Sequence, residues 1–157
     1  DDRHESENIQ TIKMTNVPES KDFPPCFYRL SIKAICKKDG KIMFIKKPSG
    51  AHGLPGGGLD FGENVQEGVA REMMEEIGLT VTKVATNPTY AWIHKFEQYR
   101  DMEWFYSYVV AYEVEIDFDI PMADAKYDEI VFLSEEEIRT AKLDWLATGL
   151  VDVIGKK

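Results

Sequence analysis

The chain contains 157 residues, which predicts a single domain because domains commonly contain about 100–200 residues. Apolar residues make up 43% and charged residues 30%, which excludes the composition of a disordered chain. With 28 acidic against 19 basic residues, the net charge of −9 makes a long nucleic acid an unfavourable partner and disfavours an anionic membrane surface. No apolar run reaches the ~20 residues of a membrane span, so no membrane partner is expected.

The first 25 residues are polar and predict an N-terminal extension, followed by one domain over residues 26–157. They contain no apolar signal core. Cys26 and Cys36 show neither a disulfide framework nor a zinc-binding spacing. We therefore expect a protein of the reduced cytoplasm.

Alternating apolar residues over 27–36 predict a half-buried strand, and the apolar run 42–45 predicts a second one. Asp39-Gly40 between them is typical of a type I′ hairpin turn. On this interpretation the outward face of the first strand carries Arg29, Ser31 and Lys33.

Residues 48–62 have loop chemistry, and residues 53–62 hold five of the eleven glycines. Asn64 is a helix N-cap and Gly78 a C-terminal cap, which predicts a helix ending at Ile77. Its apolar stripe comprises Val65, Val69, Met73 and Ile77.

One or two strands are expected over 79–96, and strong alternation predicts a central strand over 104–116. A strand over 130–133 follows, and then a second helix from Ser134 to about Ile154, opened by a capping box. This order predicts an α+β or layered α/β/α domain.

Three carboxylates of the first helix, Glu72, Glu75 and Glu76, fall within an arc of about 100° on a helical wheel. Such a charge run is commonly a solvated face. Here the loop Leu54–Gly58 immediately precedes the helix, so bare amides and carbonyls can approach a metal or phosphate beside the carboxylates. Oxygen ligands without His or Cys favour a hard divalent ion, Mg²⁺ or Mn²⁺.

The same segment contains Gly57, Glu63, Arg71-Glu72, Glu75-Glu76 and Gly78-Leu79 at fixed spacing. This pattern resembles the signature of the Nudix hydrolase family at every defined position. The spacing fits neither a Walker loop nor a dinucleotide-binding GxGxxG. Two departures from the common pattern, His52 and Asp60, lie away from the carboxylates and affect at most the substrate mouth.

The resemblance implies an α/β/α sandwich around a mixed sheet. It also implies Mg²⁺-dependent cleavage of a pyrophosphate in a nucleoside diphosphate linked to another group, by attack of water on phosphorus. The partner is then a small-molecule nucleotide. The metal ligands would be Glu72, Glu76, the Gly57 carbonyl and Glu75, which alternatively acts as the base, while Arg71 holds the cluster and Glu63 supports Arg71.

Substrate phosphates would meet Gly56, Gly57 and Gly58, with Lys46 or Lys47 offsetting their charge. The general base comes either from the helix that ends at Ile77 or from a later loop. Among the loop acids Glu129 is favoured over the others: Glu97, Glu103, Asp124 and Asp128. Half of the eighteen aromatic residues fall between Tyr90 and Tyr112, as core or as a base-stacking wall.

Two alternatives stay open on the same fold. One is an isopentenyl diphosphate isomerase-like enzyme, which would need a catalytic Cys. The other is a catalytically silent nucleotide-binding regulator. The substrate within the class, and whether the chain forms a homodimer, are also open.

Overall fold

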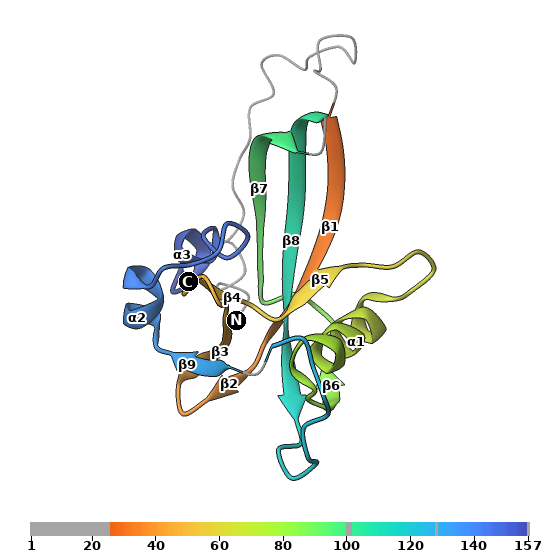
Figure 1. Cartoon of the computed structure of the whole chain (residues 1–157), viewed down its shortest axis with the longest axis vertical. Helices are drawn as coiled ribbons and strands as arrows, with labels where there is room; N and C mark the ends of the chain where they lie inside the picture. Colours follow the sequence, from red (N-terminus) through yellow and green to blue (C-terminus); the bar gives the residue numbers. More distant parts are fainter. Residues whose placement is uncertain (1–25, 100–101, 128, 157) are drawn as a thin grey trace, which may run out of the picture.

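The computed structural model describes residues 26–99, 102–127 and 129–156, so the predicted extension over 1–25 lies outside the described residues. Strands and helices are mixed along the chain (Figure 1), as the α+β prediction requires. The strands are β1 (Cys26–Ile35), β2 (Lys37–Lys38), β3 (Lys41–Lys46), β4 (His52–Gly53), β5 (Gly56–Gly58), β6 (Val81–Val84), β7 (Tyr90–Tyr99), β8 (Met102–Ile116) and β9 (Ile130–Leu133). The helices are α1 (Val65–Ile77), α2 (Glu135–Thr140) and α3 (Leu150–Val153).

The larger sheet has the strand order β5-β1-β8-β6, with β7 also pairing with β8. β8 runs parallel to β1 and antiparallel to both β6 and β7, so the sheet is mixed. The predicted central position of this strand is confirmed, because β8 pairs with three neighbours. The ends of β1, β7 and β8 project together beyond the body of the molecule (Figure 1).

A second, smaller sheet has the order β2-β3-β4, with β9 paired to β3. The turn between β2 and β3 places Asp39 at φ 51° and Gly40 at φ 75°. Two successive positive φ angles are what a type I′ turn requires, so the predicted hairpin is confirmed.

Helix α1 begins and ends where the sequence predicts. The Asn64 side chain accepts a hydrogen bond from the Glu67 backbone, and Gly78 closes the helix at φ 68°. The buried face of α1 packs through Val69, Met73 and Ile77 into a core cluster that includes Ile32 of β1 and Val110 of β8. This packing fixes the orientation of the acidic face relative to β1.

The predicted long second helix is wrong. Helix α2 stops at Thr140, and α3 is a separate short helix. Between them the chain bonds to β4: the His52 N–H donates to the Lys142 carbonyl at 2.8 Å, and the Asp144 N–H donates to the His52 carbonyl at 2.9 Å. These backbone groups cannot also form helical hydrogen bonds, so the helix is interrupted. The same bonds hold the segment after Thr140 beside β4.

The solvent-facing interpretation of the polar side of β1 is also wrong. Ser31 is 0% exposed and Lys33 is 6% exposed. In register, Ser31 lies opposite Val109 and Lys33 opposite Ala111 of β8. Both partners belong to a second core cluster that includes residues of α2 and α3, so this face of β1 is covered as well.

No helix in the described part of the chain is both long and apolar enough to cross a membrane.

Candidate active site

The acidic face of α1 is organised by one arginine. Arg71 Nε donates to Glu63 Oε1 at 2.7 Å, and Nη2 donates to Glu63 Oε2 at 3.0 Å. Nη1 donates to Glu72 Oε1 and Glu75 Oε2, both at 3.0 Å, and Nη2 also donates to the Gly58 carbonyl at 3.2 Å. Arg71 therefore joins the loop to the helix through charge-assisted hydrogen bonds.

The ionisation of this group follows from its contacts. Hydrogen bonds from Arg71 hold the pKa of Glu63 below its ordinary value. The hydrogen bond to Glu63 likewise raises the pKa of Arg71. Both groups are therefore charged at neutral pH.

Glu76 is partly buried and contacts the glycine loop directly. The Gly56 N–H donates to Glu76 Oε2 at 2.9 Å. Burial raises the pKa of Glu76, while the Gly56 hydrogen bond and the charge of Lys33 oppose that rise. Gly56 has φ 134°, a backbone conformation that favours glycine, so the loop can present its N–H here only with this residue type.

Gly57 packs against the carboxylate of Glu72. A Cβ at this position would lie 2.6 Å from Glu72 Oε1. The absence of a side chain lets the loop backbone approach the acidic face of α1 closely, as the glycine-rich segment predicts.

A cavity of about 310 Å³ adjoins this cluster. One wall is formed by Gly56, Gly57 and Glu76. Residues from distant parts of the chain complete it: Arg29 and Lys33 of β1, Lys47 after β3, Lys126 and Tyr127 before β9, and Asp144, Trp145 and Leu146 between α2 and α3.

The part of the lining formed by Lys47 and residues 144–146, here called the far wall, contains an ion pair. Lys47 Nζ donates to Asp144 Oδ2 at 2.7 Å, and Asp144 Oδ1 accepts from the Ala147 N–H at 2.9 Å. Burial acts to lower the pKa of Lys47, but the hydrogen bond and charge of Asp144 outweigh it and raise that pKa overall. Trp145 lies beside this pair, 42% exposed, with its ring centroid 5.0 Å from that of His94.

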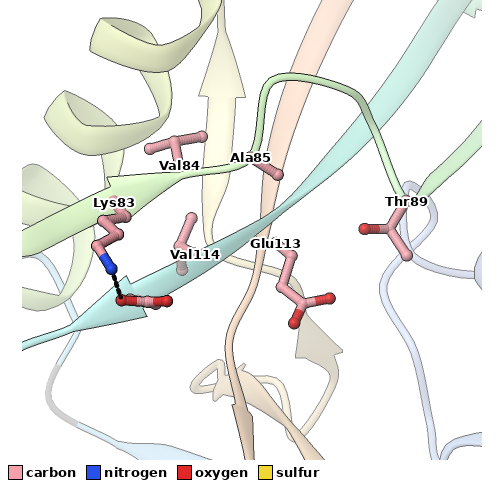
Figure 2. A pocket seen from close by; sticks show the side chains of 7 residues that line it. Lys83, Val84, Ala85, Thr89, Glu113 and Val114 are labelled. Carbon is pink, nitrogen blue, oxygen red and sulfur yellow. Dashed lines mark ion pairs between the residues drawn. The ribbon is translucent and has the colours of Figure 1, made fainter.

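A second cavity, of about 340 Å³, lies between β6 and β8 on another part of the molecule. Figure 2 shows its lining, with the Lys83 ammonium pointing toward a carboxylate of β8. That carboxylate belongs to Glu115, at 3.1 Å, and both side chains are largely exposed. No predicted site residue lines this cavity, whereas Gly56, Gly57 and Glu76 line the first, so it does not compete as the reaction site.

Two predicted site residues, Lys46 and Glu129, belong neither to the cluster around Arg71 nor to the cavity lining. Lys46 Nζ contacts Glu129 Oε1 at 2.9 Å, and neither residue lines the 310 Å³ cavity. The lysine that does line it is the adjacent Lys47. Among the other candidate bases, Asp124 is exposed, and the side chains of Glu97, Glu103 and Asp128 lie outside the described residues.

Sequence reasoning missed Arg29, Lys33 and Asp144. The two basic residues stand on the alternating polar side of a strand, where an exposed face is the ordinary interpretation. Asp144 falls inside what was predicted as a continuous helix. The signal that could have found it is the Asp144-Trp145 pair followed by Thr148-Gly149, which favours a turn and a cap over a helix interior.

The donor set suits a hard divalent ion. The side chains converging near the loop offer carboxylate oxygens, and the loop offers carbonyl oxygens, which Mg²⁺ and Mn²⁺ prefer. In the part of the chain that the structure describes, no three His, Cys, Asp or Glu side chains are grouped closely enough to hold an ion together. Arg71 and the Gly56 N–H occupy oxygens of these carboxylates instead.

Comparison with known proteins agrees with this architecture. The family model described as the NUDIX domain matches residues 28–152, and the chain belongs to the Nudix hydrolase family. The structural neighbours include the E. coli ORF135 protein, with a TM-score of 0.61 and 18% identity over 80% of this chain and 86% of that one. A MutT NUDIX hydrolase from Burkholderia pseudomallei has a TM-score of 0.59 and 19% identity, over 82% and 98% of the two chains. These likenesses establish the fold.

Two curated relatives match over shorter segments. An ADP-ribose pyrophosphatase from Methanocaldococcus jannaschii is 43% identical over 54 residues, 32% of each protein. An RNA pyrophosphohydrolase from Shewanella frigidimarina is 47% identical over 47 residues, 29% of this chain and 27% of that protein. The matched segment thus spans about a third of each relative.

Proposed function

We propose that this protein is a Mg²⁺-dependent pyrophosphohydrolase that cleaves a nucleoside diphosphate linked to another group. The observation that carries the proposal is the bond from the Gly56 N–H to Glu76 Oε2, at 2.9 Å, in the wall of the 310 Å³ cavity. It joins the glycine loop and a partly buried carboxylate in one substrate-sized site. Membership of the Nudix family and relatives named as pyrophosphatases support the same chemistry.

In this proposal Glu72, Glu76 and the Gly57 carbonyl would hold the divalent ion. When bound, such an ion neutralises pyrophosphate charge and lowers the pKa of a bound water. Binding would require the carboxylates to exchange some of their present hydrogen bonds for metal contacts.

The chain's own residues prepare the site for that chemistry. Arg71, held by Glu63, positions Glu72 and Glu75 rather than contacting substrate, because its guanidinium is already bonded to protein oxygens. The amides and carbonyls of Gly56, Gly57 and Gly58 border the space where phosphate oxygens would lie.

A general base must reach solvent water. The Glu75 side chain is 58% exposed, whereas that of Glu72 is 12% exposed. We assign the base to Glu75, because Arg71 Nη1 holds it beside Glu72, whereas Glu129 lies outside this cluster and pairs with Lys46.

An isomerase of the isopentenyl diphosphate type is not favoured. Its reaction would need a cysteine in the site, and Cys36 is buried in the core, is not part of the cavity wall, and has its pKa raised by burial. A buried thiol of raised pKa is a poor acid or nucleophile.

The test is a product-resolved hydrolysis screen with Mg²⁺, comparing the wild type with Glu76→Gln. The panel contains nucleoside triphosphates, ADP-ribose, nucleotide sugars, dinucleotides, dinucleoside polyphosphates and CoA. Glutamine keeps an acceptor for the Gly56 N–H, so the fold should persist, and kcat should fall by at least about 100-fold. Lys83→Gln, in the second cavity, is the matched control and should keep full activity. Near-wild-type turnover by Glu76→Gln would contradict the assignment, and a folded wild type that cleaves nothing would favour a binding protein.

A further inference from the structure

The cavity lining includes basic residues of β1, next to the glycine loop, that the proposed reaction has not used. Arg29 and Lys33 stand four residues apart on β1 and both line the 310 Å³ cavity. They flank Ser31, whose hydroxyl is buried in a 2.6 Å hydrogen bond with Ser107. This rigid pairing fixes the strand from which both cations extend.

Among the residues that the structure describes, no hydrogen bond or ion pair involves the Arg29 guanidinium. It packs instead against the glycine loop: a Cβ at Gly58 would lie 2.7 Å from Arg29 Nη2 and 3.0 Å from Nε. A guanidinium has five donors in a planar fork that matches carboxylate and phosphate groups, so one left unpaired inside a cavity favours an anionic ligand.

Lys33 lies four residues further along β1, next to Gly56 at the start of β5. Its Nζ donates to the Gly56 carbonyl at 2.7 Å, which leaves further ammonium donors near Gly56 and Glu76. The two cations therefore border the loop strand β5 at both ends, Lys33 at Gly56 and Arg29 at Gly58. A ligand contacting both would extend along β5 and past Gly57, beside the carboxylates.

The charge of the cavity points to the kind of anion. Its basic side chains are Arg29, Lys33, Lys47 and Lys126, against the carboxylates Glu76 and Asp144. The pairing of Lys47 with Asp144 is internal, which leaves Arg29, Lys33 and Lys126 against Glu76. In a chain with a net charge of −9, such a local excess requires a specific electrostatic explanation.

We propose that Arg29, with Lys33 beside it, binds the terminal phosphate region of a nucleoside triphosphate, which makes triphosphates the preferred substrate class. The inference rests on the proposed pyrophosphohydrolase function. A terminal phosphoryl group carries a charge of about −1.5 to −2 at neutral pH. In a nucleotide sugar one phosphate is esterified to the nucleoside and the other to the sugar. The distal end is then a neutral sugar, which offers no terminal phosphate to a guanidinium.

A binding experiment tests Arg29 independently of turnover. Isothermal titration calorimetry with inorganic tripolyphosphate compares the wild type, Arg29→Gln, Arg29→Lys and the distant control Lys83→Gln. Loss of charge-assisted hydrogen bonds should weaken binding to Arg29→Gln by about 10- to 100-fold. Arg29→Lys should recover part of the affinity because it keeps the charge and loses the fork. Equal affinity of wild type and Arg29→Gln would overturn the inference.

A kinetic experiment with base-matched substrates tests the substrate class. Wild-type kcat/KM should be higher for UTP than for UDP-glucose. Arg29→Gln should lower kcat/KM for UTP by about tenfold or more and that for UDP-glucose by less than about threefold. Equal losses on both substrates, or a wild-type preference for UDP-glucose, would overturn the inference.

The two proposals fail in different ways. Hydrolysis of UDP-glucose that depends on Glu76, with UTP the poorer substrate, would retain the pyrophosphohydrolase and reject the triphosphate preference. Loss of tripolyphosphate affinity in Arg29→Gln, in a protein that hydrolyses nothing, would retain the anion site and reject the catalytic function.

Discussion

The two sides of the cavity are built in different ways. The carboxylate side comes from one continuous segment, in which the glycine loop and α1 are joined by Arg71 and by the bond from Gly56 to Glu76. The second side, which is the rest of the lining, combines β1, the turn after β3 and the segment between α2 and α3. A contiguous motif can carry the chemistry, whereas a wall assembled from distant segments can vary in what it recognises. We therefore expect damage to the first side to reduce kcat and damage to the second to raise KM.

Replacing the central arginine should give the largest effect. Arg71→Gln removes the cation shared by Glu63, Glu72 and Glu75, so kcat should fall by about 100-fold. The free energy of unfolding should fall by about 2–3 kcal/mol, because the carboxylates lose their charge-assisted partner. Chemical denaturation and Mg²⁺-dependent hydrolysis measure the two losses.

Arg139 provides the matched control for this variant. It bonds Glu135 and the carbonyls of Val151 and Ile154, and so ties α2 to α3. Arg139→Gln should cost about 1 kcal/mol of stability and leave kcat within about twofold. A comparable loss of kcat in both variants would mean that the chemistry is not confined to the carboxylate side.

A pair of glycines should give the intermediate effect. Alanine at Gly57 would bring a Cβ to 2.6 Å from Glu72 Oε1, whereas alanine at Gly53 would clash with Asp144 Oδ2. Gly57→Ala should lower kcat by about 10- to 100-fold, since small displacements of catalytic groups are costly. Gly53→Ala should mainly raise KM. Steady-state kinetics separates the two, and identical changes in kcat and KM would remove the distinction between the walls.

The pH dependence of the far wall should give the smallest effect. The partnership with Asp144 raises the pKa of Lys47 in the folded state, despite burial acting in the opposite direction. A raised folded pKa stabilises the fold below the unfolded pKa of about 10.4, and that contribution is lost as the pH rises through the folded value. The difference in Tm between wild type and Lys47→Met should therefore be constant from about pH 8 to 9.5 and shrink above that range. A difference that grows with pH would contradict the sign of this linkage.

The carboxylate side was open to prediction because its signals are local. Asn64, Gly78 and the spacing of Val69, Met73 and Ile77 define α1, and the structure confirms both ends. Glu72, Glu75 and Glu76 follow from the same periodicity, because residues on one helix share a face at fixed spacing. Their contacts with Arg71 need only one turn of helix and a short preceding loop.

The rest of the cavity lining could not be predicted from the sequence, because it depends on contacts between distant parts of the chain. Polar alternation on β1 is the same whether Ser31 and Lys33 face water or a second layer. Only the parallel pairing of β1 with β8 places them beside Val109 and Ala111 of the second core cluster. The break after Thr140 likewise depends on His52, about ninety residues earlier, whose backbone takes up the bonds that would have continued the helix.

The sequence by itself determined helix α1, its caps and the hairpin at Asp39-Gly40, because each rests on contacts between near neighbours in the chain. It also determined the family resemblance, which lies in one short segment. The tertiary structure alone decided that Arg29, Lys33, Asp144 and Trp145 share one cavity with Glu76. Those residues lie far apart along the chain, and their proximity follows from sheet order and strand register, which local sequence patterns do not specify.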